Sequence, residues 1–251
     1  MFGTAGGLIE YKASLLATHG FATLALAYFR YDDLPKTADH GDLDIEYFEE
    51  AVEWLYKHPK VQPGGVGIHA ISRGSEIALS LAAVCDKVSA VVAIGTPKGY
   101  SGASVSYQGE TPKPLSIDRN LVICDENDVH WCRNCFNDFS DEREFKVENI
   151  KGELLLVVGE DDQILDPLMH RDAIVGRCVR HGKPIKVLSY PGTGHLIEPP
   201  YAPPCFMSFH TTLGRYVSWG GTTVEHAYAQ EDYWKHAIKF LKACVPRKSK
   251  L

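Results

Sequence analysis

The segment that decides the fold is Val66–Leu81, with the sequence VGIHAISRGSEIALSL. An apolar run ends at Ser72, and helical periodicity begins after Gly74. A strand that turns sharply into a helix with a serine at the tip is typical of a nucleophile elbow, whose strained turn favours small residues two before and two after the serine. Ala70 and Gly74 stand at those places, so the motif is A-x-S-x-G. It predicts either a nucleophilic Ser72 or a tight turn without chemistry.

Buried strands and amphipathic helices alternate on both sides of this segment. Apolar runs of strand length lie at 21–28, 66–71, 88–94, 154–158 and 185–190, and helical patterns lie at 9–17, 45–58, 74–84, 167–180 and 225–244. Such alternation predicts an α/β fold, with a mostly parallel sheet and helices on both faces. No repeat or linker divides the chain, so we expect one catalytic domain over residues 1–251. The irregular stretch 97–149 is then an insertion over the active site.

Composition narrows the class of partner. The net charge is -6 and the isoelectric point is near 6.0, which argues against nucleic acid or an anionic membrane as the main partner. No apolar run is long enough to span a bilayer, and the N-terminal residues lack the basic flank and apolar core of a signal peptide. We therefore expect largely reduced thiols. Among the seven cysteines, Cys132 and Cys135 form a C-x-x-C without a second ligand pair. Ordinary loop cysteines are favoured there over a zinc or redox role, and we expect no metal.

The chain ends in Ser249-Lys250-Leu251. A C-terminal S-K-L is an address read by the peroxisomal import receptor. Pro246 cannot continue the preceding helix, so residues 246–251 should form an exposed tail. The tripeptide predicts a peroxisomal location, with the cytoplasm as the alternative.

A serine hydroxyl is a weak nucleophile until a base takes its proton, and a carboxylate must orient that base. In α/β-hydrolases the three groups follow strands in the order Ser, Asp, His. His195 lies in a glycine-rich turn after a strand, and Asp162 follows the strand before it. Asp161 is the alternative acid, although it could instead hold the turn through backbone hydrogen bonds. Asp166 is expected to cap the next helix.

The developing oxyanion needs backbone donors. The first expected donor is the N–H of Arg73, directly after the serine. The second should come from Gly3, Thr4 or Ala5, in a glycine-rich loop that precedes a helix. Such loops also bind phosphate, but this one has neither G-x-G-x-x-G nor a Walker lysine.

These motifs lead to a resemblance. The sequence resembles the catalytic domain shared by type I acyl-CoA thioesterases and bile acid-CoA:amino acid N-acyltransferases. The matching segments are Phe2–Gly3, Gly6–Leu8, Glu10–Tyr11, Ala13–Ala17, Tyr31–Lys36, Glu46–Ala51, Gly67–Ser80, Tyr107–Glu110, Val158–Asp162, Tyr190–Tyr201 and Trp219–Gly221. The resemblance implies an α/β-hydrolase fold and a triad at Ser72, Asp162 and His195. This chain differs from the family in two respects. It begins almost at the glycine loop, so early strands of the family's sheet are missing. It also has Ala70 at a position where the family often has glycine.

The resemblance implies serine-dependent hydrolysis of acyl-CoA to free fatty acid and coenzyme A, without a cofactor, because coenzyme A is part of the substrate. One alternative is acyl transfer to glycine or taurine, for which the family's bile acid transferases carry cysteine where this chain has Ser72. Two further alternatives are a carboxylesterase of the dienelactone-hydrolase type and a truncated, non-catalytic form.

Overall fold

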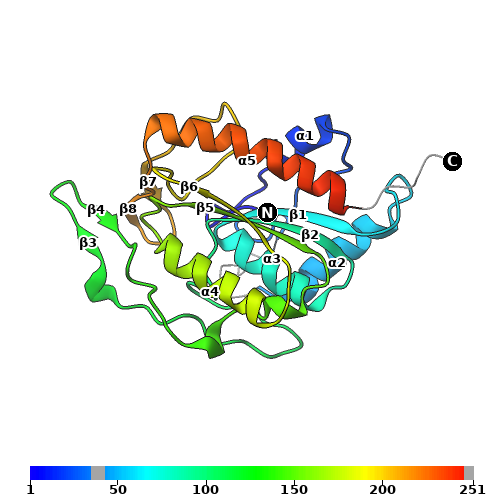
Figure 1. Ribbon diagram of the computed structural model, residues 1–251, viewed down its shortest axis with the longest axis horizontal. Helices are drawn as coiled ribbons and strands as arrows, with labels where there is room; N and C mark the ends of the chain where they lie inside the picture. The colour runs from blue at the N-terminus through cyan, green and yellow to red at the C-terminus, as the bar shows by residue number, and fades with distance from the viewer. Residues whose placement is uncertain (35–42, 246–251) are drawn as a thin grey trace.

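The computed structural model describes residues 1–34 and 43–245. The central sheet contains β1 (Val66–Ile71), β2 (Val88–Ile94), β5 (Glu153–Gly159) and β6 (Lys186–Tyr190), in the order β1-β2-β5-β6 (Figure 1). All three neighbouring pairs are parallel. Strands β1, β2 and β5 are rich in buried aliphatic residues, as strands covered on both faces require. The predicted parallel sheet is confirmed.

The helices divide between the two faces of the sheet, as Figure 1 shows. The helices α2 (Ile45–Lys57), α3 (Arg73–Val84) and α4 (Pro167–Arg180) cover one face. The opposite face is covered by α5 (Thr223–Cys244), beside which lies α1 (Tyr11–Thr18). Each face has its own apolar core, so both faces of the sheet are shielded from water. Among the described residues, no helix has the length and hydrophobicity that a membrane crossing requires.

The prediction of a strand at 21–28 is wrong. This segment forms no strand, and most of its side chains are only partly buried. A cavity of about 850 Å³ separates it from the edge of β1, and both line that cavity. At this edge the amino group of Met1 donates to His69 O, and Ile71 N–H donates to Met1 O at 3.2 Å. The segment is apolar because it faces the cavity and α2, but it lacks a neighbouring strand with which to hydrogen bond.

A second, smaller sheet was not predicted. It contains β3 (Ile123–Cys124), β4 (Val129–Trp131), β7 (Met207–His210) and β8 (Arg215–Ser218), in the order β3-β4-β8-β7. The stretch 97–149 therefore includes β3 and β4, besides 3₁₀ helices at Arg119–Leu121, Asp141–Arg143 and Val147–Asn149. The strands are too short to show a period, and the β4–β8 pair joins residues far apart in the chain. The expected tail at 246–251, with Ser249, Lys250 and Leu251, lies outside the described residues.

Buried His170, on α4, makes the stability of the fold depend on pH. Its Nδ1 accepts the Lys98 N–H at 3.3 Å, and its side chain is 1% exposed. Burial lowers the pKa of His170 from 6.5 to about 4. Between these values the unfolded chain binds the proton more readily, so the free energy of unfolding falls as the pH falls through this range.

We expect His170 to contribute a loss of up to about 1.4 kcal/mol per pH unit in this range. Urea unfolding at a series of pH values measures the slope. His170→Gln should be less stable near neutrality but show a shallower slope, whereas the exposed His181→Gln should retain the original slope. Equal slopes in all three proteins would contradict the assignment to His170.

Candidate active site

Ser72 occupies a strained turn between β1 and α3. Its φ of 54° and ψ of -127° lie in a region that residues with a side chain rarely adopt. Ser72 N–H donates to Ile94 O on the neighbouring strand at 2.8 Å. A Cβ on Gly74 would lie 2.5 Å from Phe2 O, which explains why the motif has glycine there. The chain therefore holds the serine at the strand-to-helix turn expected for a nucleophile elbow.

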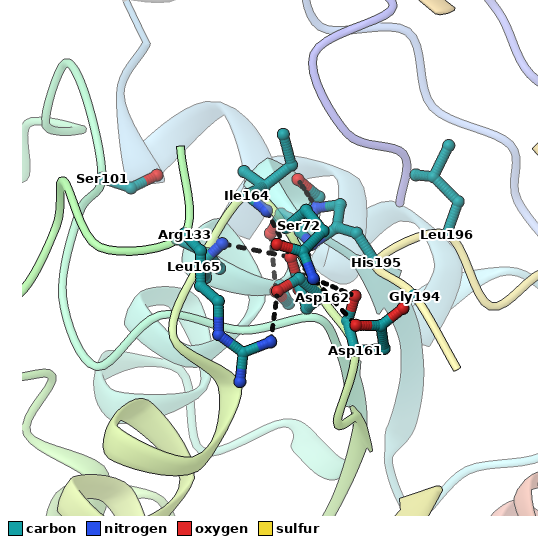
Figure 2. A network of polar contacts seen from close by, with 12 residues as sticks. Ser72, Ser101, Arg133, Asp161, Asp162, Ile164, Leu165, Gly194, His195 and Leu196 are labelled. Carbon is teal, nitrogen blue, oxygen red and sulfur yellow. Dashed lines mark hydrogen bonds and ion pairs between the residues drawn. The ribbon is translucent and has the colours of Figure 1, made fainter. Parts of the chain in front are cut away.

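The structure brings Ser72, His195 and Asp162 into one chain of hydrogen bonds (Figure 2). The distance from His195 Nε2 to Ser72 Oγ is 2.9 Å, and that from His195 Nδ1 to Asp162 Oδ2 is 2.5 Å. Each residue follows the carboxyl end of a strand of the central sheet, namely β1, β6 and β5. This is the geometry in which an imidazole can take a proton from a hydroxyl while a carboxylate orients it.

His195 is held by contacts on two sides of its ring. The backbone N–H of His195 donates to Trp219 O at 2.8 Å, and the Trp219 ring stacks on the imidazole with a centroid distance of 5.7 Å. Gly95 lies beside the ring, where an added Cβ would be 3.1 Å from His195 Nδ1. The side chain is 1% exposed. Sequence reasoning assigned Trp219 no role, and only its place in the segment Trp219–Gly221 could have drawn attention to it.

Asp162, and not Asp161, faces the imidazole. Asp162 Oδ1 accepts the N–H groups of Ile164 at 2.7 Å and Leu165 at 3.1 Å, which leaves Oδ2 for His195. Asp161 Oδ2 instead accepts the N–H of Gly221 at 2.7 Å. Asp161 thus holds the turn through the backbone, as its alternative interpretation proposed.

Asp166 caps the helix that follows this loop. Its side chain accepts the Met169 N–H at 3.1 Å, and Pro167 is the first residue of α4. The predicted helix cap is confirmed, because the carboxylate of Asp166 accepts a backbone N–H in the first turn of α4.

The glycine-rich loop touches the serine. An added Cβ on Gly3 would lie 3.1 Å from Ser72 Cβ. The next residue, Thr4, is tied to the second sheet, since its Oγ1 lies 2.9 Å from His210 Nε2, while Ala5 is exposed. On the other side of the serine, Arg73 begins α3, where the first N–H groups of a helix favour negative charge. The loop and the helix start thus flank the position in which an oxyanion would form.

The side chain of Arg73 is buried in an ion pair below the elbow. Its Nη1 lies 2.6 Å from Glu76 Oε2, and both side chains are at most 5% exposed. Lys98 is similarly buried against Glu144, with an Nζ–Oε1 distance of 3.2 Å. Both cations are therefore buried and paired, and neither is exposed at the surface to bind the phosphates of a substrate.

We expect Glu76→Ala to lower the free energy of unfolding by about 3–5 kcal/mol, because the Arg73 guanidinium remains buried without this partner. Chemical denaturation measures the change. Glu53→Ala is the matched control, since Glu53 pairs with Lys57 and Lys87 at the surface, where water screens the charges, and its loss should change the free energy of unfolding much less. Equal losses in the two variants would contradict this interpretation.

A possible metal-ligand group lies on the β3–β4 hairpin, outside the triad. It contains Cys124, Asp128 and His130, whose ligand atoms lie within 4.8 Å of one another. Cys124 and Asp128 are exposed. The group shares no residue with the triad, so the hydrogen-bonded chain at Ser72 is complete without it.

Comparisons with known proteins identify the family of this chain. The family described as "BAAT / Acyl-CoA thioester hydrolase C terminal" matches residues 43–245. A mouse relative, "Bile acid-CoA:amino acid N-acyltransferase", is 43% identical over 246 residues, covering 96% of this chain and 58% of the relative. Human "Acyl-coenzyme A thioesterase 1" is 42% identical over 246 residues, with coverage of 96% and 58%. The chain thus spans somewhat more than half the length of these relatives.

Two solved structures share the fold. A Pyrococcus furiosus esterase superposes with a TM-score of 0.58 at 12% identity, covering 98% of this chain and 82% of the esterase. A dienelactone hydrolase-like promiscuous phosphotriesterase from metagenomic libraries gives a TM-score of 0.57 at 17% identity, with coverage of 98% and 85%. At these identities they establish the fold alone, and they confirm the predicted α/β-hydrolase fold. The family match over most of the chain and the two relatives above 40% identity show that this chain belongs to the BAAT / acyl-CoA thioester hydrolase C-terminal family.

Proposed function

We propose that this chain catalyses the serine-dependent hydrolysis of acyl-CoA thioesters to free fatty acid and coenzyme A. The observation that carries the proposal is the hydrogen-bonded chain from Ser72 Oγ through His195 to Asp162. Membership of a family that includes acyl-CoA thioesterases supports the choice of a thioester as substrate. A serine at the elbow favours hydrolysis over transfer, because a serine ester is less reactive towards amines than a cysteine thioester.

In the proposed mechanism, His195 Nε2 takes the proton of Ser72 as Oγ attacks the thioester carbonyl. Asp162 keeps the proton on Nδ1 and stabilises the imidazolium. The N–H of Arg73 and an N–H from the glycine loop, at Gly3, Thr4 or Ala5, stabilise the oxyanion. The coenzyme A thiolate leaves and receives the proton from His195. Water, activated by the same imidazole, then releases the fatty acid from Ser72.

The test for hydrolysis is product analysis with and without an amine acceptor. The purified chain is incubated with medium- and long-chain acyl-CoA, alone and with taurine or glycine, and coenzyme A, free fatty acid and N-acyl amide are separated by chromatography. We expect equal amounts of coenzyme A and fatty acid, with little change on addition of amine.

The second candidate function, acyl transfer to glycine or taurine, is favoured by relatives named as amino acid N-acyltransferases. In that case the amine attacks the acylated Ser72 in place of water. Formation of N-acyl amide in excess of fatty acid would establish transfer. Turnover of simple oxygen esters without turnover of acyl-CoA would indicate a carboxylesterase instead.

We also propose that Ser249-Lys250-Leu251 is read by the peroxisomal import receptor. The support is the sequence of the tripeptide. Fluorescence microscopy of the chain tagged at its N-terminus tests this. The tagged chain should enter peroxisomes, and removal of Leu251 should leave it in the cytoplasm.

A further inference from the structure

Two cysteines that the proposed mechanism does not use lie beside the loop of the catalytic acid. Cys132 and Cys135 follow directly after β4, and both are free and buried, with exposed fractions of 8% and 2%. Their side chains lie close enough to interact. Cys135 N–H donates to Cys132 O at 2.9 Å, so residues 132–135 form a hydrogen-bonded turn.

A hydrogen-bonded turn of this kind is compatible with the spacing that a disulfide needs. The first and last Cα atoms of such a turn lie within about 7 Å of each other, and disulfides join Cα atoms about 4.4–6.8 Å apart. Cys132 is the more exposed of the pair, so it is the thiol that a small oxidant would reach first.

The turn is hydrogen bonded to the loop 160–165, which carries Asp162. Cys132 N–H donates to Gln163 O at 2.9 Å. Arg133 extends along the same loop, as Figure 2 shows, and its Nη1 donates to Glu160 O at 3.2 Å and to Asp162 O at 3.1 Å. The conformation of the turn therefore bears directly on the backbone that presents the Asp162 carboxylate to His195.

We propose that Cys132 and Cys135 form a reversible thiol–disulfide site, and that the disulfide restricts the motion of the loop 160–165, which carries Asp162, through Arg133. The inference rests on the proposed function, because it assigns Asp162 to the reaction.

The oxidant for the proposed disulfide is hydrogen peroxide. The Cys132 thiolate attacks one peroxide oxygen, which breaks the O–O bond and gives a sulfenic acid and hydroxide. The Cys135 thiol attacks that sulfur, the S–S bond forms, and water leaves. In total, two thiols lose two electrons and two protons, and one peroxide becomes two waters.

The disulfide narrows the conformations of the turn and so holds Arg133 in its donating position. Arg133 is a positioning residue, since it contacts the loop backbone and not the reacting atoms. The oxidised protein should open the loop 160–165 less often than the reduced protein. Ser72 should then react faster, because Asp162 orients His195 for a larger fraction of the time.

The experiment uses the full chain with Cys124→Ser, which removes the exposed thiol nearby. The protein is reduced with dithiothreitol, desalted, and either kept reduced or treated with hydrogen peroxide. Peptide mass spectrometry should find Cys132 and Cys135 joined, with the loss of two hydrogen atoms, and dithiothreitol should reverse the change. Backbone hydrogen exchange over 160–165 should slow by about threefold on oxidation. Labelling of Ser72 by a fluorophosphonate should accelerate by a similar factor.

Three variants distinguish formation of the disulfide from its effect on the loop 160–165. Arg133→Ala should still form the disulfide, but oxidation should no longer change hydrogen exchange over 160–165 or the labelling of Ser72. Cys132→Ser should form no disulfide, whereas Cys205→Ser, altered at a cysteine in another loop, should behave as the parent protein. A sulfinic acid at Cys132, a link to any other cysteine, or a disulfide that leaves the 160–165 loop unchanged would overturn the proposal.

These measurements do not use acyl-CoA. A chain that forms the disulfide and responds at Ser72 but does not release coenzyme A contradicts only the proposed function. A chain that hydrolyses acyl-CoA but forms no Cys132–Cys135 link contradicts only the present proposal.

Discussion

Replacing Ser72 with alanine is expected to reduce the rate of coenzyme A release by about 10⁴-fold or more. The variant lacks the only oxygen that lies 2.9 Å from His195 Nε2 in the described structure, so no acyl-enzyme can form through this base. Chromatography of coenzyme A released from medium- and long-chain acyl-CoA measures the effect. It also avoids interference from the seven cysteines of the protein, which react with thiol reagents.

The matched control for this substitution is Ser89→Ala. Ser89 lies on β2 and makes a side-chain contact with Val66 O at 3.5 Å, so its loss should leave the rate almost unchanged. Melting curves of both variants should stay close to that of the parent protein, because Ser72 Oγ is used by the site and not by the core. Full activity in Ser72→Ala would remove Ser72 from the mechanism.

Replacing Asp162 with asparagine should lower kcat by about 10³–10⁴-fold. The asparagine amide would donate to His195 Nδ1 and so place the imidazole proton on Nε2, where it faces Ser72 Oγ and cannot accept the hydroxyl proton. Steady-state kinetics with one acyl-CoA measures the change in kcat, and KM should change much less, because Asp162 is proposed to act through His195.

Asp161→Asn is the neighbouring control, with the same change of charge. Asp161 binds Gly221 N–H and Gln163 Nε2, so its loss should cost about 1 kcal/mol of folding stability and change kcat by less than about tenfold. If Asp161→Asn lowered kcat more than Asp162→Asn, the catalytic acid would be Asp161. The hydrogen-bonded chain to Asp162 would then not describe the active form.

The sequence predicts most of the central sheet because each element there has a local signal. The strands 66–71 and 88–94 match β1 and β2, and the helix 167–180 matches α4, since apolar runs and a capping Asp166 followed by Pro167 define their limits. The predicted order of Ser72, Asp162 and His195 also depends on local features. Each residue lies at or a few positions beyond the end of an apolar run, and the carboxyl ends of parallel strands meet at one edge of a sheet.

Long-range contacts decided what the sequence alone left open or predicted incorrectly. The apolar run 21–28 has strand composition, but a strand also requires a hydrogen-bonding neighbour, and a cavity separates this run from β1. The β4–β8 pair could not be predicted from residues that are more than 80 positions apart. The same reason applies to Trp219, which directly follows β8 and whose ring packs against His195.

The sequence by itself determined the elbow at Ser72, the parallel sheet and the residue types of the candidate site, because these depend on backbone preferences and hydrophobic periodicity within short segments. The tertiary structure alone decided that Asp162 rather than Asp161 faces His195. It also decided that Arg133 and Cys132 donate hydrogen bonds to the loop 160–165. The physical reason is that a hydrogen bond depends on the distance and direction between its groups, and for residues far apart in the chain only packing fixes these.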